Sequence, residues 1–455
     1  MAFRIPLSLL TTEQKLRIKK ELTIIETVKP WIQKNTFKKP QEITFYQIVN
    51  ETNEILLPLY TASQIFGQKF LNKRKTFRQI APFYMKTELR DYQKAVMKTA
   101  FEHYNENGAV FFNVFCAFGK TVVASYAASV FSQQFRLRTL VIYHLIFIEK
   151  SWIGTFANLT TAQVYVVGQT QGPITDDHQV ILSMEGRVHH IPPHILTSIG
   201  HVVFDEAHTF CTDKKVPVLL CTEPLYVTML TATKARDDGF DIMLDLLAGS
   251  KRITKISTKP FFVIKIPTSF EIEVKKTARG VDWSDLIDKF DSIPERNTLI
   301  FNIVMNNLHQ KILIAFKHVD SAKRFHAWLS EVLPRYGCTC ALLAGNVKSY
   351  EDANVIVATV AKCGIGFDER ESATNFNGKR INMLILPNSI LNNEQIYGRA
   401  GRADMSVIVE FADKNKNIKS HLNKKRKWTE SRGGIILELK ENEVFCWEQI
   451  KERMI

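Results

Sequence analysis

Residues 110–131 read VFFNVFCAFGKTVVASYAASVF, which is an apolar run, a short turn and then a second, largely apolar run. Continuous apolar runs are typical of buried parallel strands, so we expect a strand over Val110–Val114 and a helix over Val122–Phe131. A turn that leads from such a strand into a helix directs backbone N–H groups and the positive end of the helix at an anion. The stretch therefore predicts an α/β fold with a phosphate-binding turn.

The turn itself has the sequence FCAFGKT at residues 115–121. In this pattern Lys120 neutralises the β- and γ-phosphates of a nucleotide, and Thr121 holds Mg²⁺. The complete pattern also has a glycine where this chain has Val114, so an ordinary strand–helix turn remains the alternative. The other candidate nucleotide-binding residues of the turn are Cys116, Ala117, Phe118 and Gly119.

A second charged turn follows the apolar run Val202–Phe204 and reads DEAH at residues 205–208. Carboxylates at the carboxyl end of a buried parallel strand lie where open α/β sheets bind their ligands. Asp205 is therefore a candidate to hold Mg²⁺ through water, and Glu206 to orient or deprotonate an attacking water. A solvated turn is the alternative for DEAH alone, but its position roughly 80 residues after GKT favours the functional interpretation.

Two further motifs lie downstream. LTAT at residues 230–233 closes another apolar run, and its hydroxyl groups are candidates to hydrogen-bond the DEAH carboxylates, although such segments are usually structural. QIYGRAGR occupies residues 395–402, with Arg399 and Arg402 three apart on one predicted helical face. There they would reach a γ-phosphate as arginine fingers, and a merely basic helix surface is the alternative.

These motifs, in this order, resemble those of the superfamily 2 helicases of the DExH type, over about residues 89–402. FCAFGKT, DEAH, LTAT and QIYGRAGR match motifs I, II, III and VI of that family. The resemblance implies ATP and Mg²⁺ as cofactors, nucleic acid as partner, and two tandem RecA-like domains. The catalytic residues that it implies are Lys120, Asp205, Glu206, Gln395, Arg399 and Arg402.

The resemblance extends to weaker motifs. LRDYQ at residues 89–93 is similar to the adenine-side motif, with Gln93 as the candidate base reader. Residues 139–152 are similar to motif Ia, which in the family follows the nucleic-acid backbone. Residues 358–368 resemble motif V, which touches both nucleic acid and nucleotide. Its candidate nucleotide-binding residues are Gly366 and Asp368.

A finer resemblance is to the XPB-like branch, and within it to helicases of large nucleocytoplasmic DNA viruses such as iridoviruses. It is carried by CAFGKT, by VIYH at residues 141–144 before Trp152, and by TKARDDG at residues 233–239. This resemblance implies a role in viral transcription, replication or repair, with the corresponding machinery as a partner. Two residues depart from the pattern: Ala117 replaces a usual glycine, and Lys234 a frequent proline.

The remaining sequence predicts the domain organisation. We expect an N-terminal accessory region over residues 1–80, a first RecA-like domain over 81–255, a second over 256–425, and a tail over 426–455. A helix is expected within residues 11–25, capped by Thr11 or Thr12. Apolar runs predict parallel strands at 110–114, 139–143, 164–167, 179–183, 201–204, 225–230, 311–316, 340–344, 354–358, 383–386 and 407–411.

Composition supports an intracellular, soluble protein with a polyanionic partner. The formal net charge is +14 and the isoelectric point is about 9.3, which suits nucleic acid, although a generally basic surface is the alternative. No stretch reaches the roughly 20 apolar residues that cross a bilayer, and no secretory signal is evident, so no membrane partner is expected. A viral protein of this kind is expected in the host cytoplasm or nucleus, or in the virion.

The function predicted from the sequence is that of an ATP-dependent helicase or translocase on DNA, or secondarily RNA. Two alternatives stay open. One is a duplex translocase or remodeller that never separates strands, because the motor motifs are shared. The other is a degenerate nucleic-acid-binding scaffold, which Ala117 favours and the intact Lys120, Glu206 and Arg402 oppose.

Overall fold

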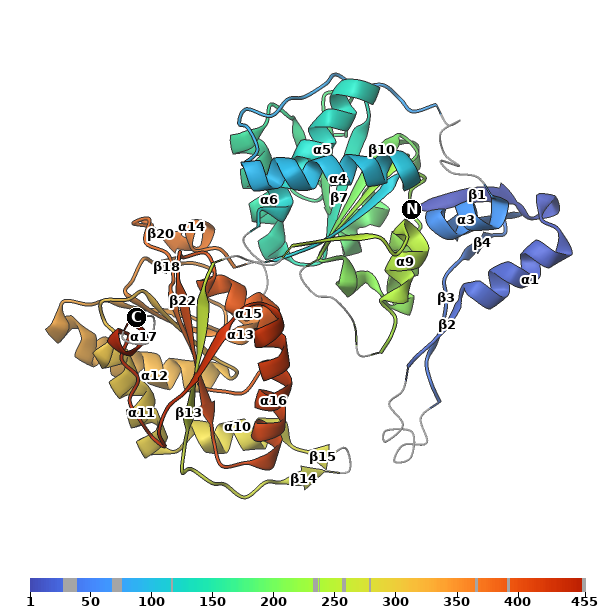
Figure 1. The fold of residues 1–455 in the computed structure, drawn as a ribbon. Coiled ribbons are helices and arrows are strands. Elements are labelled where there is room, and N and C mark those ends of the chain that lie inside the picture. Colours follow the sequence, from blue (N-terminus) through green and yellow to red (C-terminus); the bar gives the residue numbers. More distant parts are fainter. Residues whose placement is uncertain are drawn as a thin grey trace. The chain divides into compact units, whose positions relative to one another are not determined.

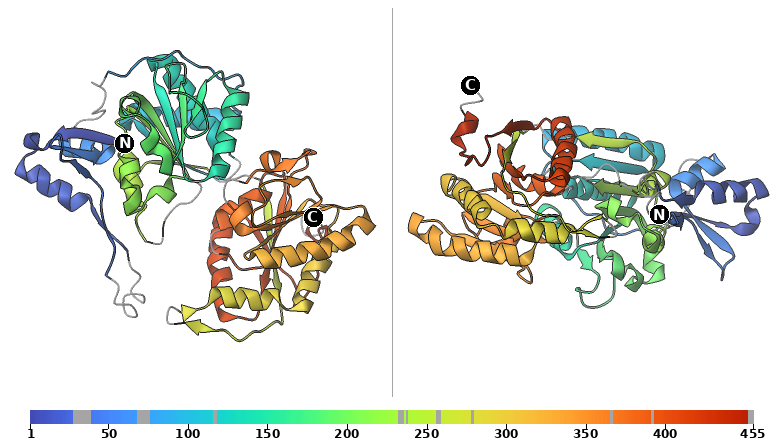
Figure 2. Two further views of the ribbon diagram at one scale, coloured as in Figure 1. Left: turned by 180° about the vertical axis from the view of Figure 1, so that it is seen from behind. Right: turned by 90° about the horizontal axis from the view of Figure 1, so that it is seen from below.

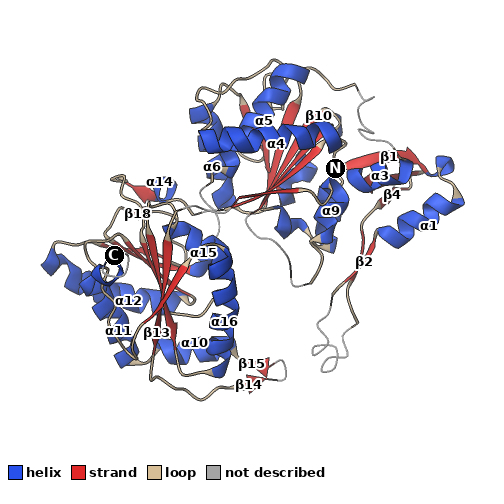
Figure 3. Ribbon diagram, in the orientation of Figure 1, coloured by secondary structure: helices blue, strands red, loops and turns tan. Residues whose placement is uncertain are grey.

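The computed structural model describes residues 1–27, 39–67, 76–115, 118–231, 236, 238–255, 259–277, 280–364, 367–390 and 393–451. The chain divides into two compact units, the first over Met1–Val114 and Phe118–Lys255 and the second over Phe115–Ala117 and Ile256–Ile455. Each unit is built on one seven-stranded parallel sheet with helices on both faces (Figures 1 and 3). The predicted α/β class, two tandem RecA-like domains with parallel sheets and a small N-terminal region, is confirmed.

The first sheet has the strand order β12-β6-β11-β10-β7-β9-β8. Its strands are β6 (Ala109–Val114), β7 (Arg138–Tyr143), β8 (Val164–Val166), β9 (Val180–Met184), β10 (Ile199–Asp205), β11 (Tyr226–Thr231) and β12 (Arg252–Lys255). Every residue of β6, β7, β10 and β11 is buried, as expected for strands that are covered on both faces. The parallel arrangement brings the carboxyl ends of these strands to one edge of the sheet.

Two sets of helices cover this sheet. One face carries α4 (Asp91–Asn107), α5 (Lys120–Phe135) and α6 (Ile146–Leu159), which Figure 1 shows against the strands. The opposite face contributes to a core shared with α7 (Pro193–Leu196), α8 (Val216–Leu219) and α9 (Ile242–Ala248). The helices after β6 and β7 therefore begin at the edge where those strands end.

The N-terminal region belongs to the first unit and packs against the elements of its parallel sheet. It contains an antiparallel sheet, β1 (Ala2–Pro6), β5 (Glu54–Pro58) and β4 (Gln47–Val49), a hairpin of β2 (Thr23–Ile25) and β3 (Glu42–Thr44), and the helices α1 (Thr12–Glu21) and α3 (Leu59–Phe66). Thr11 caps α1 in a reciprocal capping box with Gln14. Its apolar residues join one core with those of the first sheet, for example Leu57 with Met243 and Leu244.

The second sheet has the strand order β17-β19-β16-β21-β22-β13-β23. Its strands are β13 (Phe261–Pro267), β16 (Ile312–Phe316), β17 (Cys340–Leu343), β19 (Val355–Thr359), β21 (Met383–Leu386), β22 (Ser406–Ala412) and β23 (Ile435–Glu438). Its helices are α10 (Trp283–Asp291), α11 (Pro294–Asn306), α12 (Val319–Val332), α13 (Val360–Cys363), α14 (Glu369–Ser372), α15 (Asn393–Ala400), α16 (Lys416–Ser431) and α17 (Glu448–Lys451). Short two-stranded pairs are formed by β14 (Lys276–Thr277) with β15 (Gly280–Val281), and by β18 (Tyr350–Glu351) with β20 (Ala373–Thr374).

Apolar residues fill both faces of this second sheet. One core joins the strands to α11 and α12, and another joins them to α13 and α15. Figure 2 shows the two units from behind and from below, with the strands of each enclosed between helices.

The predicted C-terminal tail is corrected by the structure. The expected boundary at residue 425 lies inside α16, and β23 beyond it pairs with β13 in the second sheet. Residues 435–438 therefore complete the sheet. The sequence signal was weak because β23 is an edge strand that is at most half-buried, so it lacks the continuous apolar run of the central strands.

Cys211, Cys221, Cys338, Cys340, Cys363 and Cys446 are free thiols. In the described ranges, no three or more His, Cys, Asp or Glu side chains form a group that could hold a metal ion. None of the described helices has the length and apolarity needed to span a membrane.

Candidate nucleotide-binding site

The predicted phosphate-binding turn joins β6 to α5, and α5 begins at Lys120. Gly119 directly precedes it with φ of 91°, in the left-handed region that favours glycine. Lys120 and Thr121 therefore occupy the first turn of a helix, where backbone N–H groups and the helix dipole favour an anion. Cys116 and Ala117 lie outside the described residues.

Gln93, the predicted base reader, is buried on α4 and contacts the turn itself. Its Oε1 accepts a hydrogen bond from the Arg90 backbone N–H at 3.1 Å, and its Nε2 donates to the Phe118 carbonyl at 3.0 Å. A side chain at Gly119 would place its Cβ 2.5 Å from Gln93 Nε2 and would displace that amide, and the φ of 91° disfavours any residue other than glycine. Gln93 thus braces the backbone of the turn, and its role toward a base stays a prediction.

Asp205 ends β10 and is held at both carboxylate oxygens. Its Oδ1 accepts the backbone N–H of Glu206 at 2.9 Å, and its Oδ2 accepts the indole N–H of Trp152 on α6, also at 2.9 Å. The residue is only 6% exposed. Burial and the neighbouring charge of Glu206 raise the pKa of Asp205 to about 6, although Lys120 and Trp152 act in the opposite direction.

Glu206 faces the phosphate-binding turn. Its Oε1 lies 3.5 Å from the Lys120 ammonium, and its Oε2 lies 3.5 Å from His208 Nδ1. Its backbone has φ of 51°, a left-handed conformation that is uncommon for a residue with a long side chain. Such strain persists where the surrounding structure imposes it, often at functional sites. The structure thus brings together the GKT lysine and the DEAH glutamate.

The end of β11 lies beside this pair, because β11 is hydrogen-bonded between β6 and β10. Thr231 Oγ1 forms a 2.8 Å hydrogen bond with His208 Nδ1. Burial, which outweighs the neighbouring carboxylate of Glu206, lowers the pKa of His208. The predicted link between LTAT and DEAH is therefore made through the histidine, at Thr231, while Ala232 and Thr233 lie outside the described residues.

The candidate residues of the second unit form a separate cluster within that unit. Arg399 is buried and donates from Nη1 to the Phe367 carbonyl at 2.7 Å and from Nη2 to the Gly364 carbonyl at 2.6 Å. Arg402 donates from Nη2 to the same Phe367 carbonyl at 2.9 Å. Because α15 ends at Ala400, Arg402 lies in the following turn and not on the predicted continuous helical face.

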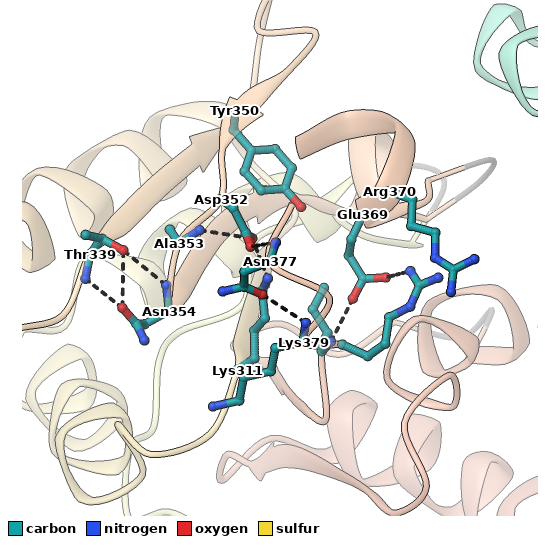
Figure 4. Close-up of polar contacts among 12 residues, drawn as sticks. Lys311, Thr339, Tyr350, Asp352, Ala353, Asn354, Glu369, Arg370, Asn377 and Lys379 are labelled. Atoms are coloured by element: carbon teal, nitrogen blue, oxygen red, sulfur yellow. Dashed lines mark hydrogen bonds and ion pairs between the residues drawn. The ribbon is translucent and has the colours of Figure 1, made fainter. Parts of the chain in front are cut away.

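Arg402 also pairs with two adjacent carboxylates. Its Nη1 lies 3.3 Å from Asp368 Oδ2 and 3.2 Å from Glu369 Oε2, and Arg380 Nη1 contacts the same two side chains at 3.0 and 2.8 Å. Burial alone would raise the pKa of Asp368, but Arg402 and Arg380 lower it. Glu369 is fully buried and also accepts the Ile381 backbone N–H at 2.7 Å (Figure 4).

The contacts of two further predicted residues of this unit, Gly366 and Gln395, are not described by the structure. Gly366 lies outside the described residues, and the structure describes Gln395 only by its place in α15.

Sequence reasoning missed several polar residues of these clusters. Trp152 was noted only as part of a motif, His208 only as a letter of DEAH, and Glu369 and Arg380 not at all. The only local signal for these residues was that each is polar or charged and lies in or near a motif. It was too common in a chain with 23% charged residues to single these four out.

Comparisons with known proteins find similar chains and similar folds. A family model described as "Type III restriction enzyme, res subunit" matches residues 86–236, which hold the turn, DEAH and LTAT. "Putative helicase 161L" of Invertebrate iridescent virus 6 is 26% identical over 434 residues, covering 88% of this chain and 93% of that protein. The predicted resemblance to iridovirus helicases is confirmed.

Two solved structures share the fold. One is the fragment structure of a "putative HsdR subunit of a type I restriction enzyme" from Vibrio vulnificus YJ016, with 13% identity, a TM-score of 0.55, and coverage of 80% of this chain and 70% of that one. The other is the DUF1998 helicase MrfA "bound to DNA and AMPPNP", with 12% identity, a TM-score of 0.52, and coverage of 83% and 58%.

The chain shares its fold with these two structures, one of which is a helicase. Within this fold, the GKT turn and DEAH lie at the carboxyl edge of the first sheet, and the arginine cluster lies in the second unit. The XPB-like branch of the helicases is not tested by these comparisons and stays a prediction.

Proposed function

We propose that the chain is an ATP-dependent helicase or translocase that couples ATP hydrolysis to movement on nucleic acid, or to its unwinding. The observation that carries this proposal is the approach of the Lys120 ammonium to the Glu206 carboxylate, 3.5 Å apart at the edge of the first sheet. The two residues are 86 positions apart in the chain, and each comes from a turn that follows a buried strand. This is the position at which open α/β sheets bind ligands.

The site also fits Mg²⁺. Asp205 and Glu206 are adjacent buried carboxylates, and burial together with the neighbouring charge of Glu206 raises the pKa of Asp205. A cation bound beside them would offset both effects. Mg²⁺ is usually held by one or two carboxylates together with substrate phosphates, so a larger cluster of protein ligands is not required. Thr121 and Asp205 would hold the ion, which when bound neutralises charge on the phosphates.

The other residues have distinct roles in the proposed reaction. Lys120 binds the β- and γ-phosphates, and Glu206 orients the attacking water and accepts its proton. His208 is proposed to position Glu206 at its other carboxylate oxygen, Oε2, and Thr231 to position His208 through their hydrogen bond. Arg402 is proposed to stabilise the charge on the γ-phosphate during turnover, after exchanging its carboxylate partners for that phosphate.

The nucleic-acid partner is proposed from charge and from the relatives. A net charge of +14 favours a polyanion, because phosphate contacts release condensed counterions. The solved helicase MrfA is described as bound to DNA, which puts DNA ahead of RNA for this chain. ATPase rates with single-stranded DNA, duplex DNA and RNA, measured in parallel, test this choice. Strand-displacement and triplex-displacement assays separate unwinding from duplex translocation.

Glu206→Gln is the variant that tests the proposed chemistry directly. Loss of a general base typically lowers turnover by about 10² to 10⁴, so we expect that decrease with ATP and nucleic-acid binding retained. The glutamine keeps the side-chain shape but neither the charge nor the basicity. Glu102→Gln, on the exposed surface of α4, is the matched control and should hydrolyse ATP at the wild-type rate. Equal turnover by Glu206→Gln and wild type would remove the assignment.

The pKa of Asp205 predicts a magnesium-dependent acid limb. Below a pH of about 6 the folded protein binds a proton at Asp205, and the neutral side chain attracts Mg²⁺ less strongly. At low Mg²⁺ concentration, ATP turnover should therefore fall as the pH drops through about 6. Raising the Mg²⁺ concentration should move this limb to lower pH, because the ion competes with the proton. An acid limb that is independent of Mg²⁺ would contradict the role of Asp205.

A further inference from the structure

The indole of Trp152 makes a contact with the proposed metal site that no motif assigns. It comes from the middle of α6, a helix with no residue in the DEAH segment, and its N–H donates to Asp205 Oδ2 at 2.9 Å. Trp152 has no solvent exposure and Asp205 is 6% exposed. Water therefore cannot readily replace this hydrogen bond, and its loss would leave a buried oxygen without that donor.

The surroundings fix the orientation of the indole. Its ring stacks on Phe156 one turn along α6, with centroids 5.8 Å apart and planes at 26°. Phe156 is itself in edge contact with Phe83, at 6.2 Å between centroids. All three rings are buried, so their packing restrains the direction of the Trp152 N–H.

The chemistry of the donor suits a carboxylate that also binds a cation. An indole donates one hydrogen bond and accepts none, and it is neutral. It can orient Asp205 without supplying the positive charge that would compete with Mg²⁺. Since the Glu206 N–H holds the other oxygen at 2.9 Å, the plane of the carboxylate is fixed. Each oxygen keeps a further lone pair for a metal ion or its water.

A second buried hydrogen bond made by α6 provides a comparison for the hydrogen bond between Trp152 and Asp205. Glu149, three residues before Trp152, accepts a hydrogen bond from the hydroxyl of Tyr143 at the end of β7. Both Glu149 and Tyr143 are buried. The two contacts tie the same helix to neighbouring strands of the first sheet, but only that of Trp152 reaches Asp205.

We propose that Trp152 is a positioning residue, which orients the Asp205 carboxylate for Mg²⁺ through its indole N–H. The assignment rests on the proposed function, since it concerns the same magnesium–nucleotide site. Partners that orient a metal ligand typically contribute 10- to 100-fold to metal affinity or activity. The contribution is specific to the N–H group, because the apolar ring alone would serve for packing.

The test is a Mg²⁺ titration of nucleotide binding, which requires no turnover. Binding of a fluorescent, non-hydrolysable ATP analogue is measured as MgCl₂ is added to wild type, Trp152→Phe and Tyr143→Phe, and the melting temperature of each protein is recorded. Trp152→Phe should raise the Mg²⁺ concentration at half-maximal binding by about 10- to 100-fold. Tyr143→Phe removes a comparable buried hydrogen bond of α6 and should leave that concentration unchanged. Binding in EDTA should be the same in all three.

A third variant allows the proposal to be tested even if Trp152→Phe does not fold. Phe156→Leu keeps the N–H but removes the ring that orients it, and should shift the Mg²⁺ midpoint in the same direction by a smaller amount. The proposal is overturned if the midpoints of the folded variants match that of Tyr143→Phe, or simply follow the melting temperatures. If wild type itself shows no Mg²⁺-dependent binding, the proposed function falls together with this assignment. If wild type binds and the variants do not differ, only the assignment falls.

Discussion

Lys120→Ala is expected to lower ATP turnover by about 10³-fold or more, because electrostatic stabilisation of developing charge is usually the largest single catalytic contribution. Lys120 begins α5 at the phosphate-binding turn, and its ammonium lies 3.5 Å from Glu206. Its loss would remove charge compensation from both the phosphates and the carboxylate. Nucleic-acid binding should be largely retained, because the positive charge is distributed over 60 Lys and Arg residues.

Steady-state ATPase assays and nucleic-acid binding on the same preparations would check this expectation. Lys98→Ala is a suitable control, since Lys98 is an exposed lysine of α4 on the same unit. It removes one positive charge without touching the turn and should keep the wild-type rate. Hydrolysis by Lys120→Ala at a rate close to that of wild type would remove the motor hypothesis.

Arg402→Ala is expected to lower turnover by about 10³ to 10⁵, the range found when an arginine finger is removed. Arg402→Lys should also fail substantially, because an ammonium cannot reproduce the planar guanidinium. Arg399 is expected to behave differently. It is buried and donates to two backbone carbonyls, so Arg399→Ala should mainly lower the melting temperature of the second unit.

The contacts of Arg402 with Asp368 and Glu369 require a control for structural damage. Arg380 pairs with the same two carboxylates, so Arg380→Gln removes comparable ion pairs but no proposed finger. Turnover, ATP affinity and melting temperature should be compared for the variants of both arginines. Slow hydrolysis by stable Arg402 variants, with turnover preserved in Arg380→Gln, supports the proposal. Equal slowing in both would show that Arg402 is structural. Wild-type rates for Arg402→Ala and Arg402→Lys would show that Arg402 is not at the active site.

Much of the fold could be predicted from local sequence. The central strands are continuous apolar runs, and each of the eleven predicted runs lies at a strand of one of the two parallel sheets. Three strands of these sheets were missed. The edge strands β12 and β23 are largely exposed, so their apolar signal was weak, whereas β13 has an apolar run interrupted only by Lys265 and lies next to an edge. The predicted second domain therefore ended at residue 425, before β23.

The basic run Lys424–Lys427 shows the limit of composition. A run of four basic residues predicts a solvated surface more often than a nuclear-localisation or nucleic-acid-binding patch. In the structure Lys425 is buried and pairs with Glu410 on β22, and Arg426 pairs with Glu438 on β23. Which lysine of a helix turns inward depends on the sheet behind it, and that information is not local.

The sequence by itself determined the strand–turn–helix that carries Gly119, Lys120 and Thr121, and the strand that ends in Asp205 and Glu206. Those features are local, since they depend on apolar periodicity and on the residues of one turn. Only the tertiary structure decided that Gln93 braces the turn, that Trp152 holds Asp205, and that Arg402 shares its carboxylates with Arg380. Each of these contacts joins residues on different elements, and their meeting is set by strand order and helix packing in the completed sheets.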